Sequence, residues 1–327
     1  RVSKVDPCRG GIASDAGRFR LTPRHTAYLR IAEGCSQRCT FCTIPAIRGP
    51  FRSRPPEQVL AEAAALIADR AVELNIIAQD TTGYGRDLDP RTSPARLLRR
   101  LDRLDGVRWI RLMYAYPRRF TDALIAAVAA CEHVVPYVDI PLQHISDPIL
   151  RRMGRGITRA TTEKLLRRIR DRIPGVVIRT ALIVGFPGET DRHFEELLHF
   201  VREFRFGALG AFPFSPEDGT PAAELPDAVP PEIRRQRAET IMLAQQEIAF
   251  AANRGMIGRR VEVLVDGKDA RGGCVGRYYG QAPEIDGTCR LDDDRPAGSF
   301  VRGTVVDCDA YDLMVAPDGE NRELEAS

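Results

Sequence analysis

Six short apolar runs alternate with helical patterns between residue 27 and about residue 210, and this alternation constrains the fold more than any other feature of the sequence. The runs predict strands at 27–32, 72–78, 109–114, 137–140, 176–184 and 207–212. Between them, residues 55–70 and 190–204 carry their apolar side chains at the spacing of one helix face. Repetition of this kind predicts an α/β fold with parallel strands and crossover helices, either an open doubly wound sheet or a partial barrel.

The pattern changes after residue 230. A long polar helix is predicted for 230–255 and ends at Gly255. From Gly258 the chain shows short strands separated by Gly and Asp turns, which predicts a small all-β barrel of about sixty residues. Because the chain begins at Arg1 in a polar stretch, we expect residues 1–26 to be a linker from an absent N-terminal domain. The expected organisation is a linker (1–26), an α/β domain (27–254), a β-barrel domain (255–320) and a tail (321–327).

Three cysteines, Cys35, Cys39 and Cys42, lie within eight residues just after the first predicted strand, at the end where parallel α/β folds place their sites. A structural zinc ion would need a fourth Cys or His, but the nearest candidates are His25, ten residues upstream, and Cys131. Thiolates also hold iron–sulfur clusters, and three of them would leave one iron of a 4Fe–4S cluster open to another ligand. We therefore predict one such cluster; the alternatives are a zinc ion and an unligated trio.

The other five cysteines are scattered, and eight in 327 residues are too few for a disulfide scaffold. This usage favours a reducing environment, so we expect a cytoplasmic protein. No run approaches eighteen apolar residues, and we expect no membrane partner. The net charge of only +3 implies no strong general attraction to nucleic acid.

The spacing Cys-x3-Cys-x2-Cys, with the aromatic residue Phe41 before the last cysteine, resembles the signature of the radical S-adenosylmethionine (SAM) superfamily. The resemblance implies a partial (β/α)6 barrel, which agrees with the six predicted strand–helix units. It also implies that the amino and carboxylate groups of SAM bind the open iron and that an electron from the cluster splits SAM into methionine and a 5′-deoxyadenosyl radical. Because the cofactors carry this chemistry, we assign no side chain as a catalytic acid or base, and none to His144 in particular.

The resemblance assigns polar residues at three strand ends to SAM. Gln79 and Asp80 follow the second strand, where they could meet the SAM amino group. Gln143 follows the fourth strand and could face the ribose, and Arg179 on the fifth strand could pair with the SAM carboxylate. Each of these side chains could instead support the site from behind.

Residues at the end of the fifth strand complete the expected cofactor-binding set with Phe41. Gly185 and Gly188, in "GFPGET", would let the backbone approach the adenine closely. The stretch resembles the fifth-strand motif of the superfamily. A plain strand-to-helix turn is the alternative for both glycines.

Longer motifs narrow the resemblance. The chain contains, in order, "EGCSQRCTFCTIPAIRGPFRSRP", "QDTTGYG", "DIPLQHISDPILRRMGRG", "GFPGET" and "YYGQAPEIDG". Together they resemble the methylthiotransferases, and among them the RimO type, whose C-terminal module is a TRAM domain. The resemblance implies that a methylthio group is added to the β-carbon of an aspartate in the twelfth protein of the small ribosomal subunit.

That reaction implies further components. It uses two SAM molecules, an electron donor, and a sulfur source that the sequence does not identify. The resemblance also implies a second 4Fe–4S cluster in an N-terminal domain with three more cysteines. This chain carries only Cys8 ahead of the motif, so we expect it to bind one cluster and cleave SAM without completing methylthiolation alone.

Charge bears on the choice between this family and the MiaB type, which modifies isopentenyl-adenosine in tRNA. Residues 259–312 hold 8 Lys and Arg against 11 Asp and Glu, a net charge of −3. A module that binds tRNA should be basic, so an acidic barrel favours a basic ribosomal protein as partner, although acidic runs are often only solvated surface. A nucleic-acid-binding module with a structural zinc ion is the remaining alternative, and it predicts a colourless protein.

Overall fold

The computed structural model describes residue 20 and residues 23–269 and 272–318. The first nineteen residues of the expected linker and the whole of the expected tail (321–327) therefore lie outside the described residues. Contacts divide the chain into two compact units, one up to Ile248 and one from Ala249. Each unit is described by itself.

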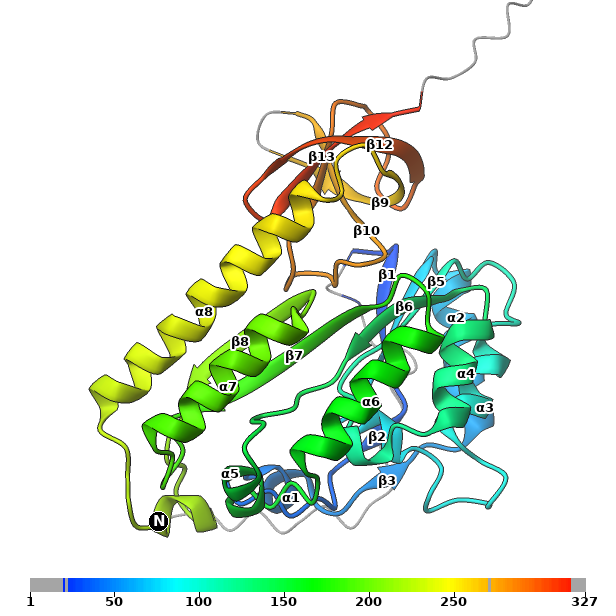
Figure 1. The fold of residues 1–327 in the computed structure, drawn as a ribbon. Helices are drawn as coiled ribbons and strands as arrows, with labels where there is room; N and C mark the ends of the chain where they lie inside the picture. The colour runs from blue at the N-terminus through cyan, green and yellow to red at the C-terminus, as the bar shows by residue number, and fades with distance from the viewer. Residues whose placement is uncertain (1–19, 21–22, 270–271, 319–327) are drawn as a thin grey trace, which may run out of the picture. The chain divides into compact units, whose positions relative to one another are not determined.

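The first unit is built on a six-stranded parallel sheet in the order β1-β4-β5-β6-β7-β8. Each predicted strand corresponds to one strand of this sheet, which confirms the α/β prediction (Figure 1). The strands are β1 (Thr26–Arg30), β4 (Glu73–Ile77), β5 (Trp109–Leu112), β6 (Val134–Asp139), β7 (Val177–Val184) and β8 (Ala208–Pro213).

Strand β6 begins three residues before the predicted position. Pro136 interrupts its apolar run, and a proline carries no N–H to donate to a ladder. The β5–β6 register accordingly shifts between Ile110 and Leu112. The neighbouring strands keep regular parallel registers, with Leu74 beside Ile110 and Val138 beside Ile178.

Helices cover the outer face of the sheet (Figure 1). Two of them begin with a capping box, α6 at Thr158 and α7 at Thr190, in which side chain and backbone satisfy each other's donors. The first unit contains α1 (Ile44–Arg48), α2 (Pro56–Ala68), α3 (Pro94–Leu101), α4 (Asp122–Ala130), α5 (Asp147–Arg152), α6 (Arg159–Arg172) and α7 (Asp191–Phe204), the short turns η1 (Thr81–Gly83), η2 (Pro117–Arg119) and η3 (Pro221–Glu224), and most of α8 (Pro231–Arg254). Apolar side chains between these helices and the sheet, such as Leu74, Ile110 and Leu166, are fully buried.

A two-stranded antiparallel ladder closes the loop that carries the cysteines. Strand β2 (Ala32–Glu33) pairs with β3 (Arg52–Ser53), so that the two ends of the loop 34–51 are held side by side. The sequence pattern did not predict this ladder, because two-residue strands have no periodicity to read. Its consequence is a cysteine loop anchored at both ends.

The second unit contains a closed five-stranded barrel, which confirms the predicted all-β module. Its strands are β9 (Arg260–Lys268), β10 (Cys274–Tyr278), β11 (Cys289–Leu291), β12 (Phe300–Asp309) and β13 (Asp312–Pro317). Alternate residues of these strands point inward, and Val263, Val265, Val305 and Leu313 form the core. Closure leaves no unpaired edge in so small a sheet.

Candidate metal and cofactor site

Backbone contacts fold the cysteine loop back on itself. The Cys35 N–H donates to the Gly49 carbonyl at 3.1 Å, and the Phe51 N–H donates to Ser36 Oγ at 3.0 Å. Gly34 has a φ of +78°, and a Cβ there would lie 2.4 Å from the Pro50 carbonyl oxygen. Only glycine satisfies both conditions, so the first turn of the loop depends on this residue.

The three cysteines line one pocket of about 160 Å³ at the carboxyl ends of the strands. Phe41, Gln79 and Gln143 of the expected cofactor-binding set line it as well. The remaining lining residues are Gln37, Ile44, Pro45, Tyr114, Ala115, Tyr116, Pro141 and Arg155. The structure therefore brings six of the ten expected site residues together.

Three features of this lining are typical of a binding site. Gln79 Oε1 is buried and has no hydrogen-bond partner among the described residues. Tyr114 and Gln143 adopt left-handed backbone conformations, with φ of +56° and +75°. Such strain in non-glycine residues is uncommon and clusters at functional sites. An unsatisfied buried acceptor likewise favours a bound partner.

The segment after α5 holds the middle of the cysteine loop. The Thr40 N–H donates to the Met153 carbonyl at 3.1 Å, and Thr40 Oγ1 donates to the Arg152 carbonyl at 2.8 Å. Gly154 packs so tightly here that a Cβ on it would lie 2.3 Å from the Arg38 carbonyl oxygen. Cys39 and Cys42 are thus positioned by a segment more than a hundred residues away in the sequence.

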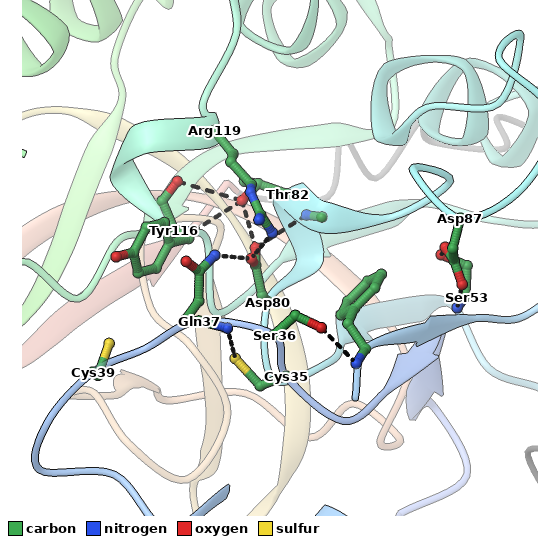
Figure 2. A network of polar contacts seen from close by, with 12 residues as sticks. Cys35, Ser36, Gln37, Cys39, Ser53, Asp80, Thr82, Asp87, Tyr116 and Arg119 are labelled. Atoms are coloured by element: carbon green, nitrogen blue, oxygen red, sulfur yellow. Dashed lines mark hydrogen bonds and ion pairs between the residues drawn. The ribbon is translucent and has the colours of Figure 1, made fainter. Parts of the chain in front are cut away.

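Asp80 holds the loop from the other side without lining the pocket. Its Oδ2 accepts hydrogen bonds from Gln37 Nε2 and Arg119 Nη1, both at 2.9 Å (Figure 2). Its Oδ1 accepts from Thr82 Oγ1 at 2.6 Å and from the Gly83 N–H at 3.0 Å. All four contacts are internal to the protein, so the carboxylate anchors Gln37 beside the cysteines.

The other three expected residues also lie outside the pocket lining. Arg179 Nη1 donates to Asp139 Oδ1 at 3.0 Å. A Cβ on Gly185 would meet the side chain of Arg234 at 2.3 Å, and one on Gly188 would meet the Arg152 guanidinium. Both glycines thus admit arginine side chains at the end of β7, and their approach to a cofactor stays a prediction.

Arg155 is a pocket residue that the sequence reasoning missed. Its side chain is buried, and Nη1 lies 3.5 Å from Cys39 Sγ. The residue sits in "RRMGRG", a run of three arginines and two glycines around one methionine that is typical of exposed surface. The one available signal was its inclusion in the longer motif shared with the methylthiotransferases.

Burial controls the acidity of two of the thiols. It raises the pKa of Cys35 against a smaller opposing effect of the Gln37 N–H. It likewise raises the pKa of Cys42, while the backbone at Ile44 and the charge of Arg155 act in the opposite direction. A bound metal would therefore have to displace protons from these sulfurs.

The donor set fits an iron–sulfur cluster better than one ion. In the ranges that the structure describes, no three His, Cys, Asp or Glu side chains gather closely enough to hold a single metal ion. Thiolates about 2.3 Å from one zinc ion would lie at most about 4.6 Å apart. Three soft thiolates spread around a shared pocket instead suit a cluster with several irons.

Comparison with known proteins agrees with this geometry. The model of the radical SAM superfamily matches residues 29–201, and that of the TRAM domain matches residues 257–317. Ribosomal protein uS12 methylthiotransferase RimO of Anaeromyxobacter sp. (strain K) is 50% identical over 305 residues, which are 92% of this chain and 65% of that protein. The RimO protein of Geobacter sulfurreducens is 48% identical and matches 91% of this chain over 67% of its own length. The chain belongs to the RimO family of radical SAM proteins.

The match covers only part of these relatives, since the chain spans about two thirds of their length. Among solved structures, the radical SAM methyltransferase TsrM from Kitasatospora setae, with cobalamin and a [4Fe-4S] cluster bound, matches 61% of this chain and 38% of its own. The TM-score is 0.50 at 20% identity, which supports the fold alone. Among the described residues of the RimO-family chain, no helix is both long and apolar enough to cross a membrane.

Proposed function

We propose that this chain is the radical SAM and TRAM portion of an aspartate methylthiotransferase that acts on ribosomal protein uS12. The observation that carries the proposal is the convergence of Cys35, Cys39 and Cys42 on one pocket in a chain about half identical to RimO proteins. Those relatives are named for their action on uS12. The proposal further specifies that the methylthio group is added to the β-carbon of an aspartate.

The three cysteines would hold one 4Fe–4S cluster through three of its irons. When bound, the cluster and SAM would supply an electron and a carbon radical able to remove hydrogen from an unactivated carbon. Gln79 and Gln143 present polar groups to the same pocket and would orient SAM, with Phe41 packing beside the last cysteine. We keep Arg179, Gly185 and Gly188 as proposed contacts at the edge of this site, and Asp80 as the residue that fixes Gln37.

The protein's own contribution is to bind, orient and exclude water. The pocket walls include Tyr116 and Ala115, which are buried. His144, just beyond Gln143, accepts the Ser146 N–H through Nδ1 at 2.9 Å and is fully buried. Its position therefore suits support of the strand end, and no proton transfer is assigned to it.

The acidic TRAM domain suits a basic protein partner better than tRNA. A ribosomal protein as substrate would place the reaction in the cytoplasm. An electron donor and a sulfur source complete the proposed set of partners, and a second cluster in an N-terminal domain would complete the sulfur chemistry.

Anaerobic reconstitution with iron and sulfide tests the cofactor assignment. We expect about four irons per chain, a brown protein, and release of 5′-deoxyadenosine from SAM after reduction. About one zinc per chain in a colourless protein would overturn the cluster, and about eight irons would overturn a single cluster.

The target can be tested without the sulfur half of the reaction. We expect a uS12 peptide deuterated at the aspartate β-carbon to pass deuterium to 5′-deoxyadenosine, as measured by mass spectrometry. A peptide deuterated only at a neighbouring residue is the control. Deuterium transfer from an isopentenyl-adenosine RNA, and none from the peptide, would assign the chain to tRNA instead.

A further inference from the structure

Arg155 is a buried cation at the wall of the cysteine pocket. Only 5% of the residue is exposed, and it lines the pocket together with the three cysteines. Nη1 lies 3.5 Å from Cys39 Sγ, within hydrogen-bonding range for sulfur. No other arginine is among the pocket-lining residues.

The protein fixes this guanidinium in place. Nη2 donates to the Pro141 carbonyl at 2.6 Å, and the group stacks 4.3 Å from the centre of the Tyr116 ring. The Tyr116 hydroxyl donates in turn to the Arg155 carbonyl at 2.6 Å. Backbone and side chain are thus both held, so the group needs little rearrangement to act on Cys39.

These contacts leave the charge itself uncompensated within the described residues. A carbonyl, an aromatic ring and a thiol surround the guanidinium, and no carboxylate pairs with it. Its Nε is buried and makes no hydrogen bond there. Buried charges are normally paired, because the free-energy cost of removing an unpaired charge from water is not offset by a favourable interaction. The missing anion is expected at the pocket wall, where Cys39 lies.

We propose that Arg155 is a positioning residue whose charge neutralises the Cys39 thiolate and its cluster, and that it thereby raises the reduction potential of the cluster. The inference rests on the cluster of the proposed function. One-electron reduction adds a negative charge to the site, and a fixed cation within a few ångströms stabilises the reduced state more than the oxidised state. Cluster potentials respond to net charge and to hydrogen bonds on the sulfurs, and Arg155 supplies both.

Redox titration of the reconstituted protein, followed by electron paramagnetic resonance of the reduced cluster, tests the proposal. We expect Arg155→Met to make reduction at least about tenfold less favourable, which is about 59 mV for one electron. Arg155→Lys keeps the charge and should retain most of the wild-type potential, whereas Arg155→Gln should behave like Arg155→Met. Arg151→Met is the matched control, because it removes an exposed cation from the same segment and should leave the potential unchanged.

Each other outcome is decisive. An unchanged potential in a fully loaded Arg155→Met, or an equal shift in Arg151→Met, would overturn the proposal. Weaker SAM binding at an unchanged potential would assign Arg155 to SAM instead. If Arg155→Met does not take up iron, the same redox titration of Arg155→Lys and Arg155→Gln tests the proposal. Loss of iron in Arg155→Lys as well would overturn a role for the charge. A wild-type protein without a cluster would refute the proposed function rather than this inference.

Discussion

Gln37 Nε2 donates a 2.9 Å hydrogen bond to Asp80 Oδ2 and so joins the cysteine loop to the end of strand β4 (Figure 2). Gln37 lies between the first two cysteines, and its N–H also points at Cys35 Sγ from 3.4 Å. The carboxylate of Asp80 is therefore a fixed point from which the loop is positioned. Asp80 therefore holds the loop that would bind the metal, and its contact with SAM stays a prediction.

Replacement of Asp80 by alanine should loosen this loop. It leaves Arg119 without this acceptor, removes the side-chain acceptor of the Gly83 N–H, which keeps only the Asp80 carbonyl, and releases Gln37. We expect a loss of about 2–4 kcal/mol in the free energy of unfolding. Urea denaturation measures this loss, and iron uptake should fall with it. Asp89→Ala, at an exposed carboxylate that contacts only Arg91 among the described residues, should change neither quantity. Full iron uptake by Asp80→Ala would show that the anchor is dispensable.

Replacement of Gly154 by alanine should destabilise the protein through a steric clash in addition to backbone strain. Gly219, which has a similar backbone conformation and no close neighbour, serves as the control for backbone strain alone. Gly154 and Gly219 have φ of +69° and +78°, but a Cβ on Gly154 meets the Arg38 carbonyl oxygen whereas one on Gly219 meets nothing within 4 Å. Gly219→Ala should cost about 1–2 kcal/mol for the left-handed backbone alone. Gly154→Ala should cost about 1–3 kcal/mol more and displace the cysteine loop.

Urea denaturation of both glycine variants gives the comparison, with iron content as a second measurement. Only Gly154→Ala should lose iron. Equal losses of stability in the two variants would mean that the loop moves away from Gly154 without cost.

The three clustered cysteines should be required individually for cluster binding. We expect Cys35→Ala, Cys39→Ala or Cys42→Ala to reduce the iron content from about four to below about one per chain. The reason is that two thiolates are too few to retain a 4Fe–4S cluster that is held by three. Cys131→Ala is the control, since this half-buried thiol packs against the core of the α/β unit away from the pocket lining. Iron loss in Cys131→Ala equal to that in the other three would contradict the assignment.

The sequence predicted the repetitive part of this structure well. Parallel strands and their helices carry apolar residues at regular spacing, and all six strands and the C-terminal barrel are where periodicity placed them to within a few residues. Proline limited the prediction at β6, and the two-residue ladder of β2 and β3 was too short to have a period.

The site was predictable where residues act through local spacing, and not where they act through tertiary contact. Cys35, Cys39 and Cys42 are close in sequence and share one pocket. Arg155 reaches the same pocket from a segment 116 residues beyond Cys39. Gly185 and Gly188 have the positive φ that favours glycine and make room for the side chains of Arg234 and Arg152, while their contact with SAM stays a prediction. Local sequence indicates that space is needed and does not say what fills it.

Glu189 should make the stability of the protein depend on acid pH. It is buried just before α7 and accepts from the Gly185 N–H at 2.9 Å and from Arg237 Nη1 at 2.8 Å, and His144 Nε2 lies 3.4 Å from its Oε2. Burial alone would raise the pKa of Glu189, but the contacts with His144, Gly185 and Arg237 together outweigh it and leave the pKa below its ordinary value.

The direction of this pH dependence follows from the difference in proton binding between the folded and the unfolded chain. Below about pH 4.3, the ordinary pKa of a glutamate, the unfolded chain takes up a proton at this position while the folded chain does not. The stability due to Glu189 is therefore complete above that pH and is lost as the pH falls toward the lowered pKa of the folded state. Glu189→Gln carries no titrating group and should lack this contribution.

Urea unfolding between pH 7 and pH 3.5 measures the effect as a difference between proteins. Glu189→Gln should be less stable than the wild type at pH 7, by about 1–3 kcal/mol for the weakened contacts to Arg237 and Gly185, and the difference should shrink as the pH falls. Subtracting the two curves removes other acid-sensitive groups, such as Glu196, whose pKa is also lowered despite its partial burial because of Ser146 and Arg159. Glu247→Gln, at an exposed position of α8, should parallel the wild type throughout. A difference for Glu189→Gln that stays constant down to pH 3.5 would mean that the carboxylate contributes shape and hydrogen bonds but no charge to the folded state.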